Sequence, residues 1–419
     1  MKKDNDEILV KNSKSTLQLS RRDFMKIAAT YGLSSTLLAA TTLTGIITAP
    51  TLAQAANSTY EKRFKNTPKF KLKFGASTLD PVQLLQVRGG MLDFVRDLEE
   101  RTDGAIAVEM FYSGSICSQL NGIGKLQQGI IDLFGATTQN AASQAPYYNV
   151  LDFAYQFPSV SSAFHFLYSP KSMKLLRDPL RKLHNVEMLF TTAELRNITL
   201  GLKYKESELI TDIKKLKGAK IRVSGTQLGI IALHLLGVNP VPIDWGETID
   251  AMRQGLVDGM ESTTASVLHG GAYPVVSQCL EIGLFGCNLH TCMSSKVFDK
   301  LGGQLQDAVM ESSYVAQIMC QFGQQAINLD TIGVSTPPLP GTCFAEHGIR
   351  VAFFDQEQKK QLEQLSSPQY QPEPWAQWLE RLSKWAGVAN VNEEIYNIAR
   401  EIPAETLPEN VEPRRWWKS

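Results

Sequence analysis

Few side chains in this sequence are spaced as a catalytic or metal centre requires. Cys287, His290 and Cys292 form the tightest group of potential metal ligands, but their spacing fits no common zinc site, and we expect them to pack locally. Gly122 and Gly124 lack the third glycine of a dinucleotide-binding loop, so this pair predicts the start of a helix. We therefore expect no metal, no cofactor and no catalytic residues.

Arg222 is placed for a different chemistry, the binding of an anion. It lies near the end of a predicted strand, 219–223, ahead of a predicted helix, 227–236, and ligand clefts of α/β proteins form at such crossovers. Its guanidinium can donate two parallel hydrogen bonds to a carboxylate. It could equally pair with a structural acid such as Asp258 or Glu261, and the residues alone leave both interpretations open.

The elements around Arg222 belong to a strand–helix pattern that runs twice along the chain. Short apolar strands alternate with amphipathic helices, as they do in βαβ units. This repetition favours two similar α/β lobes over one large sheet. The first run comprises 70–74, 87–98, 105–112, 118–128 and 130–134, and the second comprises a short basic helix at 211–218, then 219–223, 227–236, 238–243, 245–254 and 256–260.

Two passages of these runs echo each other in detail. Residues 126–132 and 252–258 each contain a helix end, a glycine, two apolar residues and an aspartate. Helix–glycine–strand junctions converge on such a pattern, so one match does not establish a duplication.

The chain after the second run is mainly helical. Trp416 and Trp417 near its end are expected to pack along a lobe surface, with a contact to a partner as the alternative. We expect a long helix at 304–329, a proline-rich break at 337–341, and helices at 356–365 and 373–385.

The passage around Arg222 resembles a known family. Residues 217–223 read Lys-Gly-Ala-Lys-Ile-Arg-Val, 236–242 read Leu-Gly-Val-Asn-Pro-Val-Pro, and 251–261 read Ala-Met-Arg-Gln-Gly-Leu-Val-Asp-Gly-Met-Glu. These motifs are similar to those of the extracytoplasmic solute receptors of TRAP transporters, the DctP-like family, over about residues 70–351. The resemblance implies an α/β periplasmic binding protein with two lobes and a long helix that spans them.

The resemblance also implies what the protein binds and delivers. Receptors of this family close over a small organic acid, clamp its carboxylate with an arginine, and hand it to the membrane permease subunits of an ion-coupled, ATP-independent transporter. The clamping arginine corresponds to Arg222, and a second family arginine corresponds to Arg196. The same resemblance adds Trp245, Glu261 and Ser262 to the substrate-binding set. Ser262 stands where the family commonly has asparagine, so an amide is missing at that contact.

Domain limits follow from the same resemblance. We expect lobe I to comprise 56–195 and 288–327, and lobe II to comprise 196–287 and 328–419, including the C-terminal helices.

Residues 1–55 resemble an export signal. Residues 20–26 match the twin-arginine pattern S-R-R-x-F-x-K, and residues 27–60 carry no charge. Small residues at Ala53 and Ala55 predict cleavage after Ala55, after which the folded protein would reside in the periplasm, delivered by the twin-arginine translocase. The alternative is a retained membrane anchor, because the uncharged run exceeds the ~20 residues that span a bilayer.

The charge balance excludes some partners. Lys plus Arg number 42 and Asp plus Glu number 42, so the formal net charge is zero and nucleic acid is not an expected partner. Residues 1–55 carry 7 basic and 4 acidic side chains, which leaves a net charge of −3 on the rest. An anion must therefore be attracted locally. The six cysteines are too few for a disulfide scaffold, and buried thiols or one or two disulfides both remain open.

Two other functions remain open from the sequence. Twin-arginine export often serves proteins that load a cofactor before crossing, so an exported periplasmic cofactor enzyme is the alternative from another class. A binding component of an ATP-driven importer is the closer alternative. The leading interpretation is a receptor that binds its solute without transforming it.

Overall fold

The computed structural model describes residues 7–12, 15–20, 64–77, 90–333 and 337–418. Contacts divide the chain into two units, Met1–Thr67 and Pro68–Ser419. In the first unit, β1 (Glu7–Asn12) and β2 (Ser15–Ser20) form an antiparallel pair. The two arginines of the twin-arginine pattern, the uncharged run up to residue 60 and the predicted cleavage site after Ala55 lie outside the described residues. Within the described ranges, no helix combines the length and apolarity of a membrane span.

The second unit contains two sheets, of which the first has five strands. Its strand order is β4-β3-β5-β13-β6. Strand β3 runs parallel to β4 and β5, whereas β13 runs antiparallel to β5 and β6. The strands are β3 (Phe70–Ala76), β4 (Ile106–Tyr112), β5 (Leu133–Thr137), β6 (Val186–Thr191) and β13 (Leu289–Ser294).

The second sheet follows the order β14-β11-β7-β10-β8-β9, and β12 pairs with β7 off this path. Strand β8 is parallel to β9 and β10, and β7 is antiparallel to β10 and β11. The strands are β7 (Glu194–Gly201), β8 (Lys220–Val223), β9 (Asn239–Pro242), β10 (Gly259–Thr263), β11 (Val276–Glu281), β12 (Gly286–Cys287) and β14 (Arg350–Phe353).

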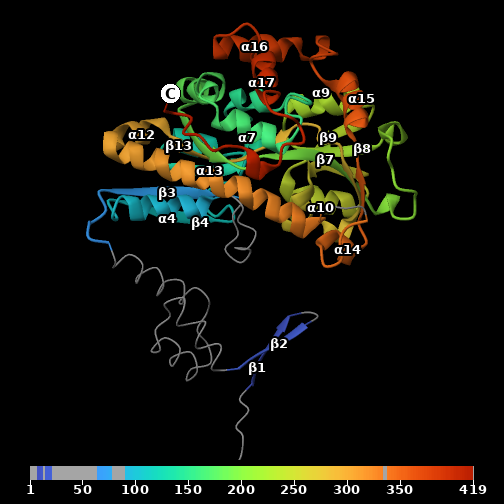
Figure 1. The fold of residues 1–419 in the computed structure, drawn as a ribbon, viewed down its shortest axis with the longest axis horizontal. Helices are drawn as coiled ribbons and strands as arrows, with labels where there is room; N and C mark the ends of the chain where they lie inside the picture. Colours follow the sequence, from blue (N-terminus) through green and yellow to red (C-terminus); the bar gives the residue numbers. More distant parts are fainter. Residues whose placement is uncertain (1–6, 13–14, 21–63, 78–89, 334–336, 419) are drawn as a thin grey trace, which may run out of the picture. The chain divides into compact units, whose positions relative to one another are not determined.

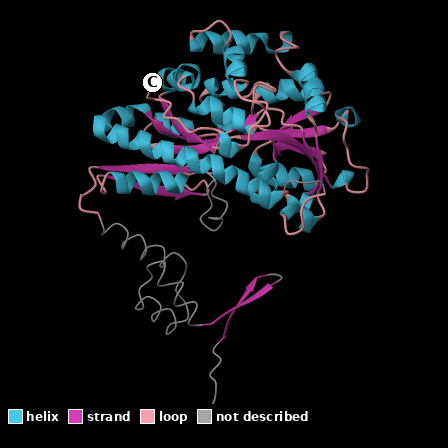
Figure 2. Ribbon diagram, viewed as in Figure 1, coloured by secondary structure: helices cyan, strands magenta, loops and turns pink. Residues whose placement is uncertain are grey.

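Helices flank both sheets (Figure 2). Those that follow strands of the second sheet begin at polar caps: the hydroxyls of Thr226 and Thr263 accept backbone N–H groups of the first turns of α9 and α11. The helices are α4 (Met91–Arg101), α5 (Gly122–Gln127), α6 (Thr138–Ala141), α7 (Val160–Tyr168), α8 (Asp178–His184), α9 (Gln227–Leu235), α10 (Trp245–Arg253), α11 (Thr264–His269), α12 (Ser295–Leu301), α13 (Gly303–Thr331), α14 (Cys343–His347), α15 (Gln356–Ser366), α16 (Ala376–Ala386) and α17 (Val391–Ala399). Shorter 3-10 or π turns are η2 (Pro146–Leu151), η3 (Met173–Arg177), η4 (Leu202–Tyr204), η5 (Ile213–Leu216), η6 (Tyr273–Val275), η7 (Glu373–Trp375) and η8 (Pro408–Asn410).

The two echoing passages form the same junction, once in each sheet. Gly129 and Gly255 both adopt positive φ, 75° and 72°. In the first sheet the Asp132 carboxylate accepts the backbone N–H of Lys73 at 2.8 Å. In the second, the Asp258 carboxylate accepts the backbone N–H of Lys220 at 2.9 Å. The second unit has two halves, one built around each sheet. The two halves therefore share the same helix–glycine–aspartate junction.

This junction also explains why two strands begin later than predicted. The strands expected at 130–134 and 256–260 begin at Leu133 and Gly259 instead. The residues after each glycine form a turn that delivers the aspartate to the neighbouring strand, so regular pairing starts only beyond it.

Three helical predictions also need correction. The helix expected from 118 begins only at Gly122, where a side chain would collide with the ring of Phe134, 1.9 Å from an added Cβ. The short basic helix at 211–218 is the 3-10 turn η5. The helix expected at 373–385 divides into η7 and α16, and α17 was not predicted although the side chain of Asn390 caps its first turn.

The chain passes between the sheets three times, and the third passage contains the long helix that extends along both. The crossings lie between β6 and β7, between β12 and β13, and between β13 and β14. Helix α13 contacts α4 and β6 beside the first sheet, and α11 and α14 beside the second (Figure 1). The predicted α/β class with a long helix along both halves is confirmed. The predicted lobe limits stay a prediction, because the contact-based division separates only residues 1–67 from the rest.

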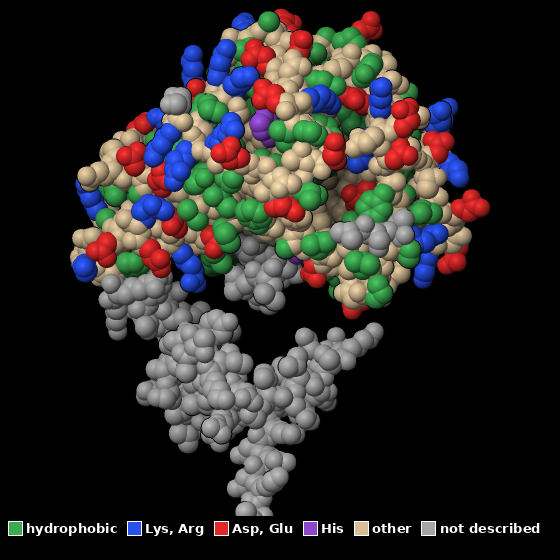
Figure 3. Space-filling view, in the orientation of Figure 1, with side chains coloured by type: hydrophobic (Ala, Val, Ile, Leu, Met, Phe, Trp, Pro, Cys, Tyr) green, Lys and Arg blue, Asp and Glu red, His purple; other side chains and the backbone are tan. Residues whose placement is uncertain are grey.

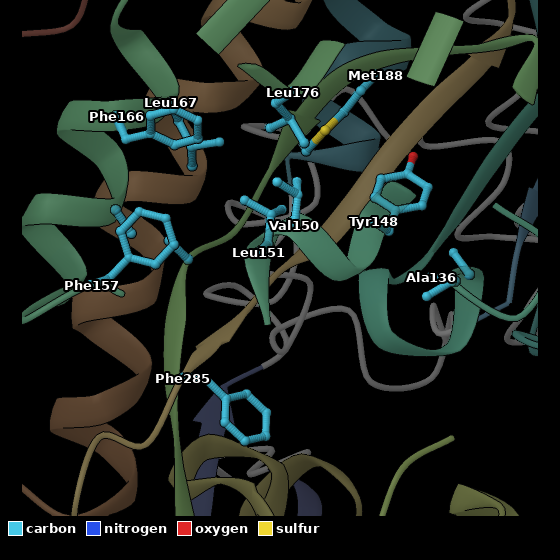
Figure 4. Close-up of a cluster of buried hydrophobic side chains, with 14 of the residues drawn as sticks. Ala136, Tyr148, Val150, Leu151, Phe157, Phe166, Leu167, Leu176, Met188 and Phe285 are labelled. Carbon is cyan, nitrogen blue, oxygen red and sulfur yellow. The ribbon is translucent and has the colours of Figure 1, made fainter. Parts of the chain in front are cut away.

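An aromatic-rich core fills the half built around the first sheet. It continues to the segments that connect the two sheets. Figure 4 shows Phe157 beside Phe166 and Leu176 beside Met188; the ring centres of the two phenylalanines are 5.9 Å apart. The C-terminal tail closes this core, since Trp416 is 1% exposed and lies 4.4 Å from the guanidinium carbon of buried Arg177. The predicted packing of the tryptophan pair is confirmed: Trp416 is buried, and half-buried Trp417 packs against the same core.

We expect Trp416→Ala to destabilise the protein by about 3–5 kcal/mol, because it empties a core site and removes the aromatic face over a buried cation. The matched change Trp417→Ala removes a half-buried ring and should cost clearly less. Urea unfolding of both variants measures the difference. Equal losses would show that Trp416 does not close the core.

Candidate functional site

Three neighbouring strands of the second sheet position the predicted site residues. Arg196 lies in β7, Glu261 and Ser262 in β10, and Arg222 in β8. Strand β10 lies between β7 and β8, so the two arginines approach it from opposite sides. Trp245 begins α10 and lies next to Arg222. The predicted residues are therefore brought into one region.

Arg222 is a buried cation whose terminal amino groups donate to none of the described residues. Its side chain is 1% exposed, its Nε donates to the carbonyl of Ile243 at 2.9 Å, and its guanidinium carbon lies 5.5 Å from the ring centre of Trp245. Burial, and secondly the charge of Arg196, lower the pKa of Arg222 to about 10. The group stays charged at neutral pH. Within the described residues it forms no ion pair with a carboxylate.

Arg196, unlike Arg222, has a carboxylate partner, because Glu261 neutralises its charge. Its Nε and Nη2 donate to the two carboxylate oxygens of Glu261, the second at 3.0 Å, and Nη2 also donates to the Glu261 carbonyl at 3.2 Å. Its Nη1 donates to the sulfur of Cys287 at 3.3 Å. Burial alone would lower the pKa of Arg196, but the Glu261 carboxylate beside it raises the pKa above its usual value. Four of the five guanidinium N–H groups are thus engaged.

The acids that could have paired with Arg222 are used elsewhere. Glu261 pairs with Arg196, and Asp258 accepts from the ammonium of Lys203 at 2.8 Å. Of the two interpretations open for Arg222, the structural ion pair with either acid is therefore wrong.

Ser262 is buried and its hydroxyl already has a partner. It is 4% exposed, and its Oγ lies 2.7 Å from the Oγ of Ser266 in the first turn of α11. An asparagine amide at this position would extend further than this hydroxyl. Ser262 therefore presents a smaller polar group from β10 than an asparagine would.

Sequence reasoning missed a buried carboxyl next to the ion pair. Asp152 is 0% exposed, and it accepts from Gln139 Nε2 at 2.6 Å and from Thr226 Oγ1 at 2.9 Å. Burial raises the pKa of Asp152 to about 7, against the opposing effect of these hydrogen bonds. Because Thr226 caps α9 of the second sheet, this carboxyl joins the two halves. Its one sequence signal is a single acid inside the apolar run 150–155.

The cysteine–histidine group does not converge on one point. Cys287 contacts Arg196, whereas the Nδ1 of His290 lies 2.7 Å from the carbonyl oxygen of Ala136. Burial lowers the pKa of His290 to about 4, so its ring is neutral. Across the part of the chain that the structure describes, no three acidic, histidine or cysteine side chains are placed to hold a metal ion.

Comparison with known proteins identifies similar chains. The 2,3-diketo-L-gulonate-binding periplasmic protein YiaO of Escherichia coli is 23% identical over 220 residues, which is 52% of this chain and 65% of that protein. The uncharacterized protein YiiZ of Salmonella typhimurium is 26% identical over 167 residues, 40% of this chain and 50% of that protein. The chain thus spans about half to two thirds of the curated relatives it matches.

A solved structure shares the fold over a longer span. The sugar acid binding protein DctPAm of Advenella mimigardefordensis, in complex with galactonate, superposes with a TM-score of 0.63 at 22% identity, covering 80% of this chain and 99% of that one. This likeness confirms the two-lobe α/β fold. Residues 86–373 match the family described as bacterial extracellular solute-binding protein, family 7. The chain therefore belongs to this family, which carries the name DctP.

Proposed function

We propose that this protein is the periplasmic receptor of a TRAP transporter, and that it binds a small organic acid through Arg222 and delivers it to membrane permease subunits. One observation carries the proposal: Arg222 is a buried guanidinium that lacks a carboxylate partner among the described residues. A buried cation of this kind is costly unless an anion meets it. A ligand carboxylate supplies that anion.

The ligand carries one carboxylate and an uncharged polar remainder. Arg196 is neutralised by Glu261, so Arg222 is the cation that the described residues of this region leave for a ligand. Hydroxyl groups at Ser262 and Ser266 and the indole of Trp245 suit a hydroxylated carbon chain. DctPAm binds galactonate and YiaO is named for a keto sugar acid, which agrees with a sugar acid or a related hydroxy acid.

The energy of such a clamp is sufficient for a receptor. Charge-assisted hydrogen bonds contribute about 1.5–3 kcal/mol each. Two of them, together with the burial of the ligand, reach the roughly −8 kcal/mol of a micromolar complex. Binding and release need no catalytic base, and we propose that the two lobes close about the bound acid without transforming it.

Two lobes enclose the site in this proposal. Lobe I comprises 56–195 and 288–327, and lobe II comprises 196–287 and 328–419. The carboxyl of Asp152, held between Gln139 and Thr226, lies where these lobes meet. An exported cofactor enzyme remains the alternative, and an absorption spectrum or metal analysis of the purified protein distinguishes it through a chromophore or a stoichiometric metal.

We also propose that the chain is exported already folded, through its twin-arginine signal, and cleaved after Ala55. The cysteines support this route, since all six are unpaired and buried. Burial raises the pKa of each of these thiols, and the thiolate is the reactive form. A folded chain would therefore keep its thiols in an oxidising compartment, whereas an unfolded one would expose them to disulfide formation.

Replacing Arg222 by lysine tests the clamp. Lysine keeps the charge but loses the planar pair of donors, so we expect the affinity for galactonate to fall by about ten-fold or more in calorimetry. Arg253→Lys, on the exposed part of α10, is the matched control and should leave the affinity unchanged. Thermal melts of both variants verify folding. Unaltered binding by a folded Arg222→Lys variant would remove Arg222 from the site.

A comparison of two ligands tests how many ligand carboxylates the site accepts. Galactonate and galactarate share the same carbon chain, and galactarate has a second carboxylate in place of the terminal hydroxymethyl group. With one uncompensated cation in the site, galactarate should bind about ten-fold or more weakly, because its second charge would be desolvated without a partner. Calorimetry at fixed pH and salt measures both constants. Equal or tighter binding of galactarate would contradict a one-carboxylate site.

Thiol titration tests the protection of the cysteines. We expect the native protein to react negligibly with Ellman's reagent over minutes, and all six thiols to react after denaturation. Replacing the signal by one that exports unfolded chains should yield protein with fewer titratable thiols. Rapid reaction of the native protein, or six intact thiols by either route, would remove this support for folded export.

A further inference from the structure

Asp152 is a buried carboxyl whose two oxygens both accept hydrogen bonds from uncharged groups. Its side chain is 0% exposed, Oδ1 accepts from Gln139 Nε2 at 2.6 Å, and Oδ2 accepts from Thr226 Oγ1 at 2.9 Å. A carboxylate that is buried on neutral donors is costly, and such a group tends to hold a proton instead. Asp152 can therefore exist in two protonation states that differ by one charge.

The hydrogen bonds around Asp152 can satisfy either of these states. The Thr226 hydroxyl lies 2.9 Å from Asp152 Oδ2 and 3.4 Å from the side-chain oxygen of Asn149 in η2. When Asp152 is ionised, this hydroxyl donates to Oδ2. When Oδ2 carries a proton, the proton is donated to the Thr226 oxygen and the hydroxyl hydrogen turns to Asn149. The carboxyl can therefore gain or lose a proton without a movement of the surrounding atoms.

Among the described residues, two charged groups face Asp152 from the second sheet. Burial has the largest effect on the pKa of Asp152 and raises it to about 7, and its two hydrogen bonds lower it. Of the charges, Arg196 in β7 lowers this pKa and Glu261 in β10 raises it. The thiol of Cys287, 4.0 Å from the amide oxygen of Gln139, is neutral because burial raises its pKa to about 12.

The same two charges act on Arg222. Burial lowers the pKa of Arg222 first and the charge of Arg196 lowers it second, whereas Glu261 raises it. Thr226, which binds Asp152, caps α9 directly after the loop that follows β8, the strand of Arg222. The two arginines and Glu261 together carry one positive charge, which an ionised Asp152 cancels and a protonated Asp152 leaves in place. The region with a protonated Asp152 should therefore attract an anion more strongly.

We propose that Asp152 is a proton-binding site coupled to the organic-acid site, so that the receptor binds its acid together with a proton taken from solvent onto Oδ2. The ligand carboxylate and the Asp152 carboxylate carry the same charge inside the protein, so each disfavours the other. Protonation of Asp152 then strengthens acid binding, and acid binding raises the proton affinity of Asp152 by the same factor. The proton site deepens the proposed receptor function and rests on it.

Calorimetry at about pH 6 and about pH 8.5 tests the coupling. The carboxyl of galactonate is ionised at both values, because such groups titrate near pH 4. We expect the wild type to bind galactonate about five-fold or more tightly at the lower pH. In Asp152→Asn the amide accepts from Gln139 and donates to Thr226, as the protonated carboxyl does, so the affinity should equal that of the wild type at low pH and stay constant.

Glu187→Gln is the matched control for this substitution. Glu187 is a buried carboxylate of β6 that pairs with Arg181, beside the first sheet. The variant should keep the pH dependence of the wild type. Thermal melts verify that both variants fold.

The proton is counted directly when the titration is repeated at about pH 7 in buffers of different ionisation enthalpy. The slope of the observed binding enthalpy against the buffer enthalpy gives the number of protons taken up with the ligand. We expect about 0.3 proton or more for the wild type and for Glu187→Gln, and none for Asp152→Asn. The wild-type slope needs no variant, so the test survives if Asp152→Asn fails to fold.

The outcomes separate the proton site from the receptor. If the wild type binds galactonate equally at both pH values without taking up a proton, the proton site is wrong and the receptor stands. A folded Asp152→Asn variant that keeps the wild-type pH dependence would overturn the proton site in the same way.

If the wild type binds no organic acid, the proposed function fails and the stability of the free protein decides the proton site. The pKa of Asp152 is about 7 in the folded protein, above the roughly 3.9 of an unfolded chain. The stability that Asp152 contributes relative to Asp152→Asn should therefore be greatest below about pH 4 and be lost as the pH rises through about 7. Urea unfolding at about pH 5 and about pH 8 measures this difference. A constant difference overturns the proton site, and a shrinking one supports it.

Discussion

The buried ion pair between Arg196 and Glu261 determines which charge is left uncompensated among the predicted site residues. Removing two charges from water costs several kcal/mol for each, so neither group can be buried here without the other. The pair joins β7 to β10 through side-chain and backbone acceptors of one residue. Because Glu261 is committed to Arg196, it cannot neutralise Arg222 on the far side of β10. The same pair that stabilises the sheet therefore leaves one cation in need of an anion.

That ion pair is also built into the crossings between the two halves. The backbone N–H of Arg196 donates to the carbonyl of Phe285, and its carbonyl accepts the N–H of Leu284, so β7 is held to the segment that leads into the second crossing. The sulfur of Cys287 in that segment takes a further Arg196 donor. Asp152 attaches to Thr226 nearby. Buried polar contacts of Arg196 and Asp152 therefore bind the segments that connect the two sheets to one another.

The sequence predicted features that depend on neighbours in the chain, and failed where distant partners decide. Arg222 could be selected because its strand end and the surrounding motifs are local. The paired roles of Asp132 and Asp258 were visible as a repeat, but not their hydrogen bonds to Lys73 and Lys220, which join residues far apart in sequence. Glu261 was one of two candidate partners for Arg222, and only the order of β7, β10 and β8 shows that it serves the other arginine. Nothing near Asp152 in the sequence indicates its polar partners.

The distribution of charge over the chain means that an anion is attracted by a local group and not by the net charge. Residues 1–55 account for a net +3 within a chain of zero formal charge, so the part beyond them carries a small negative charge that does not attract anions over long distances. Basic and acidic side chains are interspersed over the face in Figure 3, and at physiological salt such exposed charges are screened within about 8 Å. A buried guanidinium is screened far less, because its field acts in a medium of low dielectric constant. A buried arginine without a carboxylate partner among the described residues, such as Arg222, can therefore select an acid that the surface does not attract.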